Sequence, residues 1–471
     1  MSSLFDGVLK LKKGISLRAI DWSLVAFIAS IALFAFLAGA LVVQWHLPPS
    51  EQLRNAARAF EAVSGMEDEV FLNSLNKIDR SARARPEFAK LDKSAGKELL
   101  LVTGGPNQDA KRCPKFGCLA WIFDRQGHVL HAWPLPLDAL FKNAKGFKGN
   151  VNPRNFYPVG LGMLRDGSLV ATFHARNTYP YVAGIARISW TGEVVWQHVD
   201  GAHHWLHIGD DGLIYAPYQE RRSPDFLSKY AVNHRCEHES YDEGIRIYRQ
   251  NGEVVRTILL TETFLRDGYP GLLYSVRDDC DPIHLNSVDV ATEEVASRIP
   301  GANAGDLLVS VRELSAIIML DPQTGQIKHM INGRTAAQHS AHFLKDGSVI
   351  AFDNQGGMRF RGGSRILRID MGTGRYSTIF PQAQSESILP FSSEDGGTVS
   401  PSPDSSRAIV SSKDGSRSFE IDIATGKPLW LMKQVFDVAP FLKEDRPVAG
   451  YFKPYGVYYL TEDQLSDLSF E

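Results

Sequence analysis

Short apolar runs separated by glycine-containing turns dominate the chain from about residue 96 onward. One set of turns has a polar residue, then a glycine, then an apolar run, and its glycines are Gly127, Gly192, Gly252, Gly325, Gly374 and Gly426. A second set lies between them, in the segments LRDGSLVATF, IGDDGLIYAPY, LKDGSVIAFD and SPDSSRAIVSS. Turn residues flanked by alternating β-forming residues are typical of hairpins. The pattern therefore predicts an all-β body.

The spacing of these turns predicts the architecture of the body. The first set recurs about every 60 residues, which leaves room for two hairpins in each unit. Each unit is then a four-stranded antiparallel sheet, and six units fill residues 96–471. Such sheets cannot bury both faces alone, so we expect them to stack radially as a six-bladed β-propeller. A pair of β-sandwiches is one alternative, and a seventh blade containing the last stretch, GYFKPYGVYYL, is another.

A single long apolar run precedes the body. No charged residue occurs from Trp22 to Val43, and a helix of this length crosses a hydrocarbon layer of about 30 Å. Trp22 and Trp45 lie at its two ends, where indole rings favour the membrane interface. We therefore expect a transmembrane signal-anchor helix at 22–46. A cleaved signal peptide is the alternative, because Ala38-Gly39-Ala40 resembles a cleavage site.

Charges around this helix predict its orientation. The basic residues before it are Lys10, Lys12, Lys13 and Arg18, whereas only Arg54 and Arg58 follow closely. The positive-inside rule then places residues 1–21 in the cytoplasm and the propeller on the periplasmic side of the cell membrane. Between the two, residues 47–95 contain Ala, Leu, Phe and Glu at helical spacing after Ser50, a candidate cap. We expect a short helical stalk there.

Composition and cysteine content narrow the class further. A net charge of −3, with 51 basic and 54 acidic residues and no long basic stretch, argues against a nucleic-acid partner. The four cysteines are Cys113, Cys118, Cys236 and Cys280. Cys113 and Cys118 can close one small loop, which leaves Cys236 with Cys280. Free buried thiols are the main alternative, and the spacing is poor for zinc, so we expect no metal site.

Several polar residues occupy positions at which the inner strands of different blades would converge. They are His203 and His204 in GAHHWLHIGDDG, His284 and Asn286 in DPIHLNSVDV, and His339 in AQHSAHFLKDG. Arg312 lies in an otherwise apolar strand, and a buried arginine needs an anionic partner. Each residue alone could be a satisfied structural group. Their repeated placement indicates a site on the propeller axis.

These residues carry a resemblance to the arylsulfotransferase family over about residues 200–432. The matching motifs are His203-His204-Trp205 ahead of Gly212, His284-Leu285-Asn286, Ser310-Val311-Arg312 through Asp321 and Thr324-Gly325, Gln338-His339-Ser340, Phe352-Asp353-Asn354, and more loosely Thr398. Members are periplasmic six-bladed propellers that move a sulfuryl group from a phenolic sulfate ester to another phenol. Trp205 and Ser340 replace acidic residues of the family motifs, so the orientation of the neighbouring histidines must come from elsewhere.

The resemblance implies a role for each residue. His339 is the expected nucleophile, which carries the sulfuryl group as a sulfo-histidine. Arg312 is expected to grip two sulfuryl oxygens, while His284 and His204 exchange protons with the phenols. The substrate-binding residues are then Asn286, His203, Asn354 and Thr398. No cofactor is expected, and the chain lacks the G-x-x-x-x-G-K-[ST] loop that cradles nucleotide phosphates.

Two other classes of function remain open from the sequence. A catalytically inactive, membrane-anchored propeller that binds a ligand or protein is favoured by the two missing acids. A different propeller enzyme, such as a quinone-dependent dehydrogenase or a lyase, is the other; for the former, the tryptophans are too irregularly spaced. The oligomeric state, the donor and the acceptor are not indicated by the sequence.

Overall fold

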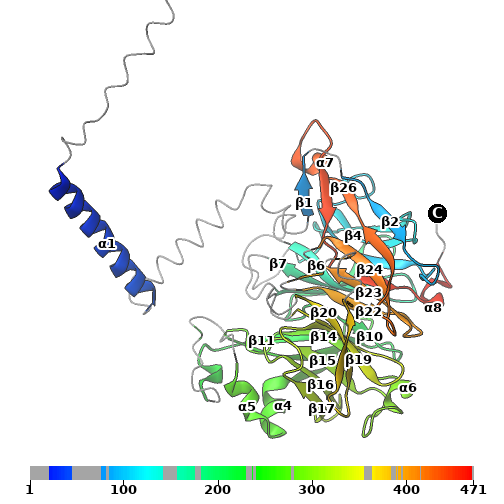
Figure 1. The fold of residues 1–471 in the computed structure, drawn as a ribbon. Helices are drawn as coiled ribbons and strands as arrows, with labels where there is room; N and C mark the ends of the chain where they lie inside the picture. Colours follow the sequence, from blue (N-terminus) through cyan, green and yellow to red (C-terminus); the bar gives the residue numbers. More distant parts are fainter. Residues whose placement is uncertain are drawn as a thin grey trace, which may run out of the picture. The chain divides into compact units, whose positions relative to one another are not determined.

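The structure is a computed structural model that divides into two units, residues 1–67 and 68–471. It describes residues 21–44, 76–80, 84–141, 156–175, 182–229, 236, 240–276, 280–354, 363–382, 389, 391–393, 396–413 and 415–468. In the first unit, α1 (Trp22–Gln44) is a single apolar helix (Figure 1). It is long and apolar enough to cross a membrane, a property that an anchor and a signal sequence share. Trp45 and Ser50 lie outside the described residues.

Six antiparallel sheets, called blades 1 to 6 here, make up most of the second unit. Blade 1 contains β28 (Val457–Tyr459), β3 (Leu100–Pro106), β4 (Gly117–Phe123) and β5 (Val129–Pro134). Blade 2 contains β6 (Phe156–Met163), β7 (Leu169–Ala175), β8 (Val182–Ile188) and β9 (Val194–His198). Blade 3 contains β10 (His207–Ile208), β11 (Ile214–Arg222), β12 (Ser240–Tyr248) and β13 (Val254–Leu259). In each of these blades four strands lie side by side in sequence order. The one exception is β28, which comes from near the end of the chain and pairs with β3 in blade 1.

The second half of the body repeats the same order. Blade 4 contains β14 (Leu285–Val290), β15 (Leu307–Val311), β16 (Ala316–Leu320) and β17 (Ile327–Asn332). Blade 5 contains β18 (His339–Phe343), β19 (Ser348–Asp353), β20 (Arg365–Asp370) and β21 (Tyr376–Phe380). Blade 6 contains β22 (Thr398–Pro401), β23 (Arg407–Ser412), β24 (Arg417–Asp422), β25 (Pro428–Lys433) and β2 (Glu87–Lys90). Short helices are η2 (Phe226–Lys229), α4 (Leu260–Arg266), α5 (Pro270–Tyr274), α6 (Glu293–Ala296), α7 (Ala439–Leu442) and α8 (Glu462–Leu465).

Contacts between the inner strands of successive blades run in a ring, to which blade 1 contributes both β28 and β3. β3 contacts β6, β6 contacts β10, β10 contacts β14, β14 contacts β18, and β18 contacts β22. The ring returns to blade 1 because β22 contacts β28, a C-terminal strand that pairs with β3 from the beginning of the body. The six-bladed β-propeller predicted from the turn spacing is therefore the observed fold. It places the first strand of each blade at the axis.

The recurring turn sequence D-x-x-T-G has a local physical cause. In the turn after β16, Asp321 Oδ1 accepts hydrogen bonds from the backbone N–H groups of Gln323 and Thr324, at 2.6 and 3.0 Å. Gly325 then adopts a left-handed φ of +70°, which favours glycine. The same arrangement recurs at Asp370 and Asp422 in blades 5 and 6.

A buried carboxylate joins the last blade to the first. Glu420 of β24 is fully buried, and its Oε1 accepts from Arg125 Nη2 at 2.9 Å and from the Tyr459 hydroxyl at 2.7 Å. Arg125 and Tyr459 belong to the blade 1 region, whereas Arg407 Nη1 of blade 6 lies 3.3 Å from the same oxygen. Glu98 accepts from both arginines at the edge of this cluster. These contacts hold the ends of the ring together.

Part of the segment assigned to the helical stalk forms strands instead. β2 pairs with β25 as an outer strand of blade 6 and lies beside strands from the end of the chain (Figure 1). β1 (Asn76–Asp79) pairs with β27 (Ala449–Phe452), which also pairs with β26 (Val435–Asp437) in a small separate sheet. The body therefore begins before residue 96. The helical pattern itself, at 50–70, lies outside the described residues.

Both disulfides have the predicted pairing. Cys113 is joined to Cys118, and Cys236 is joined to Cys280. Disulfides persist in oxidising compartments, so they indicate that the body lies outside the cytoplasm.

Candidate functional site

Three of the predicted histidines lie where first strands begin. His204 precedes β10, His284 precedes β14 and His339 opens β18. A parallel bridge joins Trp205 to Ser287, so the neighbouring first strands run in the same direction. Their starts therefore lie at the same end of the axis. This end is called the histidine end below.

The backbone at His204 is held in an unusual conformation. Its φ is +50°, and its carbonyl oxygen accepts a hydrogen bond from Thr172 Oγ1 at 2.5 Å. A Cβ atom on Gly160 of β6 would lie 2.0 Å from that oxygen. Glycine is thus required in blade 2 so that the His204 segment can approach. A non-glycine residue held at positive φ by its surroundings often marks a functional site.

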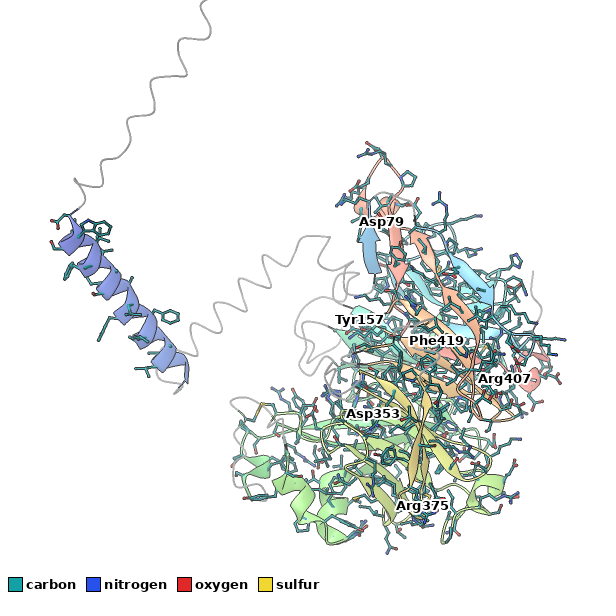
Figure 2. The ribbon with its side chains drawn as sticks, viewed as in Figure 1. Asp79, Tyr157, Asp353, Arg375, Arg407 and Phe419 are labelled. Atoms are coloured by element: carbon teal, nitrogen blue, oxygen red, sulfur yellow. A yellow bond between two sulfur atoms is a disulfide. The ribbon has the colours of Figure 1, made fainter. Side chains whose placement is uncertain are left out.

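The imidazole rings form a cluster around His204. The ring centroids of His204 and His284 are 5.0 Å apart, and His203 Nδ1 lies 2.6 Å from His204 Nδ1. His174 of β7 also packs edge-on against His204, at 4.8 Å. Beyond it, Tyr157, labelled in Figure 2, stacks on Tyr455 at 5.4 Å.

Burial keeps three of these rings neutral. It lowers the pKa of His203 to about 3, and neighbouring His284 adds to this effect. Burial and adjacent histidines also lower the pKa of His204 and of His174 well below the usual value near 6.5. Each ring therefore has one nitrogen with a lone pair at neutral pH. His174 Nε2 is buried and has no hydrogen-bond partner among the described residues.

His339 is held in one tautomer by Asn354. Its Nδ1 lies 2.7 Å from Asn354 Oδ1, while Asn354 Nδ2 donates to the carbonyl oxygens of Ser393 and Gly396 at 2.9 and 2.8 Å. Carbonyls only accept, so the amide nitrogen must face them and the amide oxygen must face His339. His339 Nδ1 therefore carries the proton, and Nε2 of the neutral ring has the lone pair. Trp205 packs edge-on against this ring, at 5.7 Å.

His284 is oriented by a carboxylate. Asp281 Oδ2 lies 2.5 Å from its Nδ1, and the backbone of His284 has a φ of +48°. Its carbonyl oxygen accepts from the backbone N–H of Arg312 at 3.1 Å. Only about a quarter of the His284 side chain (23%) is exposed, so Nε2 is the ring atom left to meet a substrate.

The remaining predicted residues differ in the contacts that their side chains make. Arg312 follows β15 and forms an ion pair with Glu313 through Nη1. Asn286 is fully buried, and its Nδ2 donates to the carbonyl oxygen of Gln338, the residue before His339. Asn286 Oδ1 and Thr398 Oγ1 are buried without a hydrogen-bond partner in the described part of the chain. These two atoms could accept a hydrogen bond from a bound molecule.

The geometry can now be compared with known families. The sequence model of the arylsulfotransferase (ASST) family matches residues 161–430, more than half of the chain. The chain belongs to the arylsulfotransferase family. The matched span includes every predicted site residue from His203 to Thr398, so the resemblance seen in the motifs is confirmed.

Solved structures give a wider comparison. A protein of unknown function from Bacteroides caccae has a TM-score of 0.45 and 12% identity, covering 78% of this chain and all of its own. Virginiamycin B lyase from Staphylococcus aureus has a TM-score of 0.35 and 11% identity, covering 65% of this chain and 74% of its own. Hydrazine synthase from Kuenenia stuttgartiensis has a TM-score of 0.36 and 11% identity, covering 64% and 70%. No curated protein matches the sequence.

Several residues of the candidate site were not predicted from the sequence. Asp281 could have been found, because it precedes His284 by three residues in the segment DPIH. His174 and Glu243 have no comparable signal, since they lie on β7 and β12, far along the chain from the motifs. Within the described segments, no group of three or more His, Cys, Asp or Glu residues is arranged to hold a metal ion.

A large cavity lies at the opposite end of the axis. Its volume is about 1200 Å³, and it is lined by the far ends of the first strands. His207, Asp289 and His342 contribute to it, with Asp289 Oδ1 2.9 Å from His207 Nδ1 and Oδ2 3.6 Å from His342 Nδ1. None of the predicted site residues lines it. The predicted histidines lie instead at the histidine end.

Proposed function

We propose that the protein transfers a sulfuryl group from a phenolic sulfate ester to a phenolic acceptor through a sulfo-histidine at His339. The observation that carries the proposal is the contact between Asn354 and His339. It assigns the proton to Nδ1 and leaves the lone pair on Nε2, which is the form of imidazole that can attack sulfur. Membership of the arylsulfotransferase family supports the reaction class.

In the first step, His339 Nε2 attacks the sulfur of the donor. The bond between sulfur and the phenolic oxygen breaks, and its electron pair stays on that oxygen. His284 enters this step with a proton on each ring nitrogen and gives the one on Nε2 to the leaving oxygen, so a neutral phenol departs and Nε2 is left with a lone pair. His339 then carries the sulfuryl group on Nε2 and keeps its proton on Nδ1, facing Asn354.

In the second step, the acceptor phenol attacks the same sulfur. Its proton passes to His284 Nε2, and the nitrogen–sulfur bond pair returns to His339. Protons and charge therefore balance over the cycle without a cofactor. His204 is the second candidate for proton exchange, because its ring lies 5.0 Å from that of His284.

Arg312 is the proposed ligand for the sulfuryl oxygens. Charge spreads over three equatorial oxygens in such transfers, and a guanidinium can contact two of them at once. Its side chain is about one-fifth exposed (21%), and its ion pair with Glu313 must open or be shared when substrate binds. Asn286, His203 and Thr398 complete the proposed binding wall. Asn354 is given a positioning role, since both of its N–H groups are used by carbonyls.

An inactive binding module is the second candidate. The observation that favours it is the occupied guanidinium of Arg312, together with Trp205 and Ser340 at the positions of family acids. A nucleotide sulfate donor is not part of either proposal, because the chain has no phosphate-cradling loop of the Walker type.

We also propose that α1 anchors the propeller to the cell membrane with its body on the periplasmic side. The basic residues before α1 and the two disulfides support this orientation. A membrane-impermeant thiol reagent should then label an added cysteine in the body of intact spheroplasts, but not one near the N-terminus.

Release of a coloured phenol from 4-nitrophenyl sulfate, with and without phenol as acceptor, tests the reaction. We expect release that phenol accelerates, and loss of transfer in His339→Ala. Mass spectrometry of protein quenched with donor alone should find one sulfuryl group on the peptide that carries His339. Failure of the wild type to release phenol from any aryl sulfate would support the binding module instead.

A further inference from the structure

We propose that Glu243 and Asp281 form a carboxyl pair that shares one proton and positions His284, and that the Cys236–Cys280 disulfide holds this pair together. The inference rests on the proposed function, because it assigns His284 the proton that the leaving phenol takes. Asp281 and Glu243 act through His284, so they are positioning residues.

The two carboxyl groups are enclosed beside the ring. Asp281 and Glu243 are 4% and 1% exposed, and they lie close enough for each carboxyl to shift the pKa of the other. Asp281 Oδ2 contacts His284 Nδ1, whereas Glu243 Oε2 accepts the backbone N–H of Leu285, the next residue. One carboxyl thus holds the ring of His284 and the other holds the chain beside it.

The charges around the pair place the shared proton on Glu243. Burial, the charge of Asp281 and nearby Asp242 raise the pKa of Glu243 well above its usual value. Burial also acts on Asp281, but His284 and the hydrogen bond from Glu243 lower its pKa. Two buried carboxylates in contact cannot both ionise, so one proton remains between them. The negative charge stays on the group that touches His284.

The groups packed around the pair come from β12 and from the segment before β10. Asp242 lies on β12 with Glu243, and its pKa is raised by burial to about 6. His203, before β10, has Nε2 3.7 Å from Glu243 Oε1 and is neutral. His204 lies beyond His203 and contacts His284. The ionised Asp281 is therefore the negative group in contact with the ring of His284.

The disulfide joins the two segments that carry the pair. Cys280 directly precedes Asp281 and is bonded to Cys236, which lies shortly before β12. The carbonyl oxygen of Cys280 also accepts the backbone N–H of Tyr241, at 3.1 Å. Asp281 and Glu243 are thus fixed relative to each other by a covalent bond and a backbone hydrogen bond. This disulfide-linked carboxyl pair orients a histidine of the site, a role that an acid at position 205 could otherwise have.

The dependence of the transfer rate on the leaving group tests whether the Asp281–Glu243 pair positions His284 as the proton donor. Aryl sulfates with weakly acidic phenols need a proton donor, whereas 4-nitrophenolate leaves with little help. Asp281→Asn should therefore slow transfer from phenyl sulfate on the order of 100-fold, but slow 4-nitrophenyl sulfate less than about tenfold. Glu243→Gln keeps a neutral hydrogen-bond donor toward Asp281. Its rate of transfer from phenyl sulfate should therefore fall less than that of Glu243→Ala.

The two disulfides give a matched control. Replacing Cys236 and Cys280 by serine should steepen the leaving-group dependence in the same way as Asp281→Asn, in protein shown to be folded by circular dichroism. Replacing Cys113 and Cys118 should leave that dependence as in the wild type. Equal losses for both donors in Asp281→Asn would overturn the proposal, because a merely structural role slows both alike.

A spectroscopic measurement separates this inference from the proposed function. A buried protonated carboxyl gives an infrared band above the range of ionised carboxylates. Glu243→Gln should remove one such band and Asp281→Asn should not, whether or not the protein transfers sulfuryl groups. Should the band survive in Glu243→Gln, the proton assignment is wrong even if the transferase activity is real.

Discussion

Asn354 Oδ1 accepts the Nδ1 proton of His339 at 2.7 Å, and the other side of the same amide is fixed by two backbone carbonyls. The amide cannot turn over without facing oxygen to oxygen. The tautomer of His339 is consequently set by the carbonyl groups of Ser393 and Gly396, outside the motif that contains the histidine. These two carbonyls supply the orientation that the serine at position 340 cannot.

Replacing Asn354 should therefore affect the chemical step more than substrate binding. Asn354→Leu removes the acceptor for Nδ1, so His339 can protonate on Nε2 and lose its nucleophile. We expect kcat to fall by about 10²–10³, the range for one preorganised polar group, with a smaller change in KM. Steady-state kinetics with 4-nitrophenyl sulfate measure this.

Ser364→Ala is the matched control for Asn354. Ser364 Oγ donates to the same Ser393 carbonyl at 3.0 Å but does not touch His339. Its loss should leave kcat close to the wild-type value. If both variants slow the reaction equally, loop disorder explains the effect and the tautomer does not.

Arg312 offers a second prediction, through the shape of its side chain. Arg312→Lys keeps the positive charge but cannot contact two sulfuryl oxygens in one plane, so kcat/KM should fall by at least about 100-fold. Glu313→Gln removes the competing carboxylate and should lower KM for the donor. An unchanged kcat/KM in Arg312→Lys would remove Arg312 from the proposed site.

The sequence predicts the parts of this molecule that depend on local interactions. The D-x-x-T-G turns are each closed by their own aspartate, as Asp321 shows. Together with the three other glycine turns of the first set, they allowed the blades to be counted from the chain alone. His204, His284 and His339 were found because each lies at the start of a first strand. By contrast, Glu243 lies 42 positions from the backbone N–H that it accepts, and β2 pairs with a strand near the end of the chain. Such distant partners leave no periodic signal.

Replacement of Asp289 tests at which end of the propeller axis the reaction takes place. Burial opposes its ionisation, but His207 and His342 hold its pKa well below the usual range. Asp289→Asn should destabilise the fold by roughly 3–5 kcal/mol, because it removes the charge of a buried carboxylate that contacts two histidines. The rate of transfer per folded molecule should stay near that of the wild type. A selective loss of kcat in folded Asp289→Asn would place a reacting group in the cavity of that end.

The buried cluster around Glu420, which joins blades 6 and 1, should contribute strongly to the stability of the fold. Glu420→Gln leaves Arg125 buried beside a neutral group, so we expect a loss of roughly 3–5 kcal/mol in the free energy of unfolding. Glu98→Gln is the control, since Glu98 is partly exposed and should cost about 1 kcal/mol or less. Urea unfolding in detergent measures both. Equal losses in the free energy of unfolding of the two variants would show that Glu420 is not the central residue of this cluster.

Neutral His203 makes stability depend on pH in a defined direction. Its pKa is about 3 in the folded state and about 6.5 in the unfolded chain, so the unfolded state binds one more proton between these values. The stabilisation is complete above about pH 6.5 and is lost as the pH falls toward 3, at about 1.4 kcal/mol per pH unit. His203→Gln should therefore unfold with a shallower dependence on pH between 6 and 4, by about one proton. An equal slope in His203→Gln and in the wild type would mean that His203 is protonated in the folded state, which would also remove the reason to treat the ring cluster as neutral.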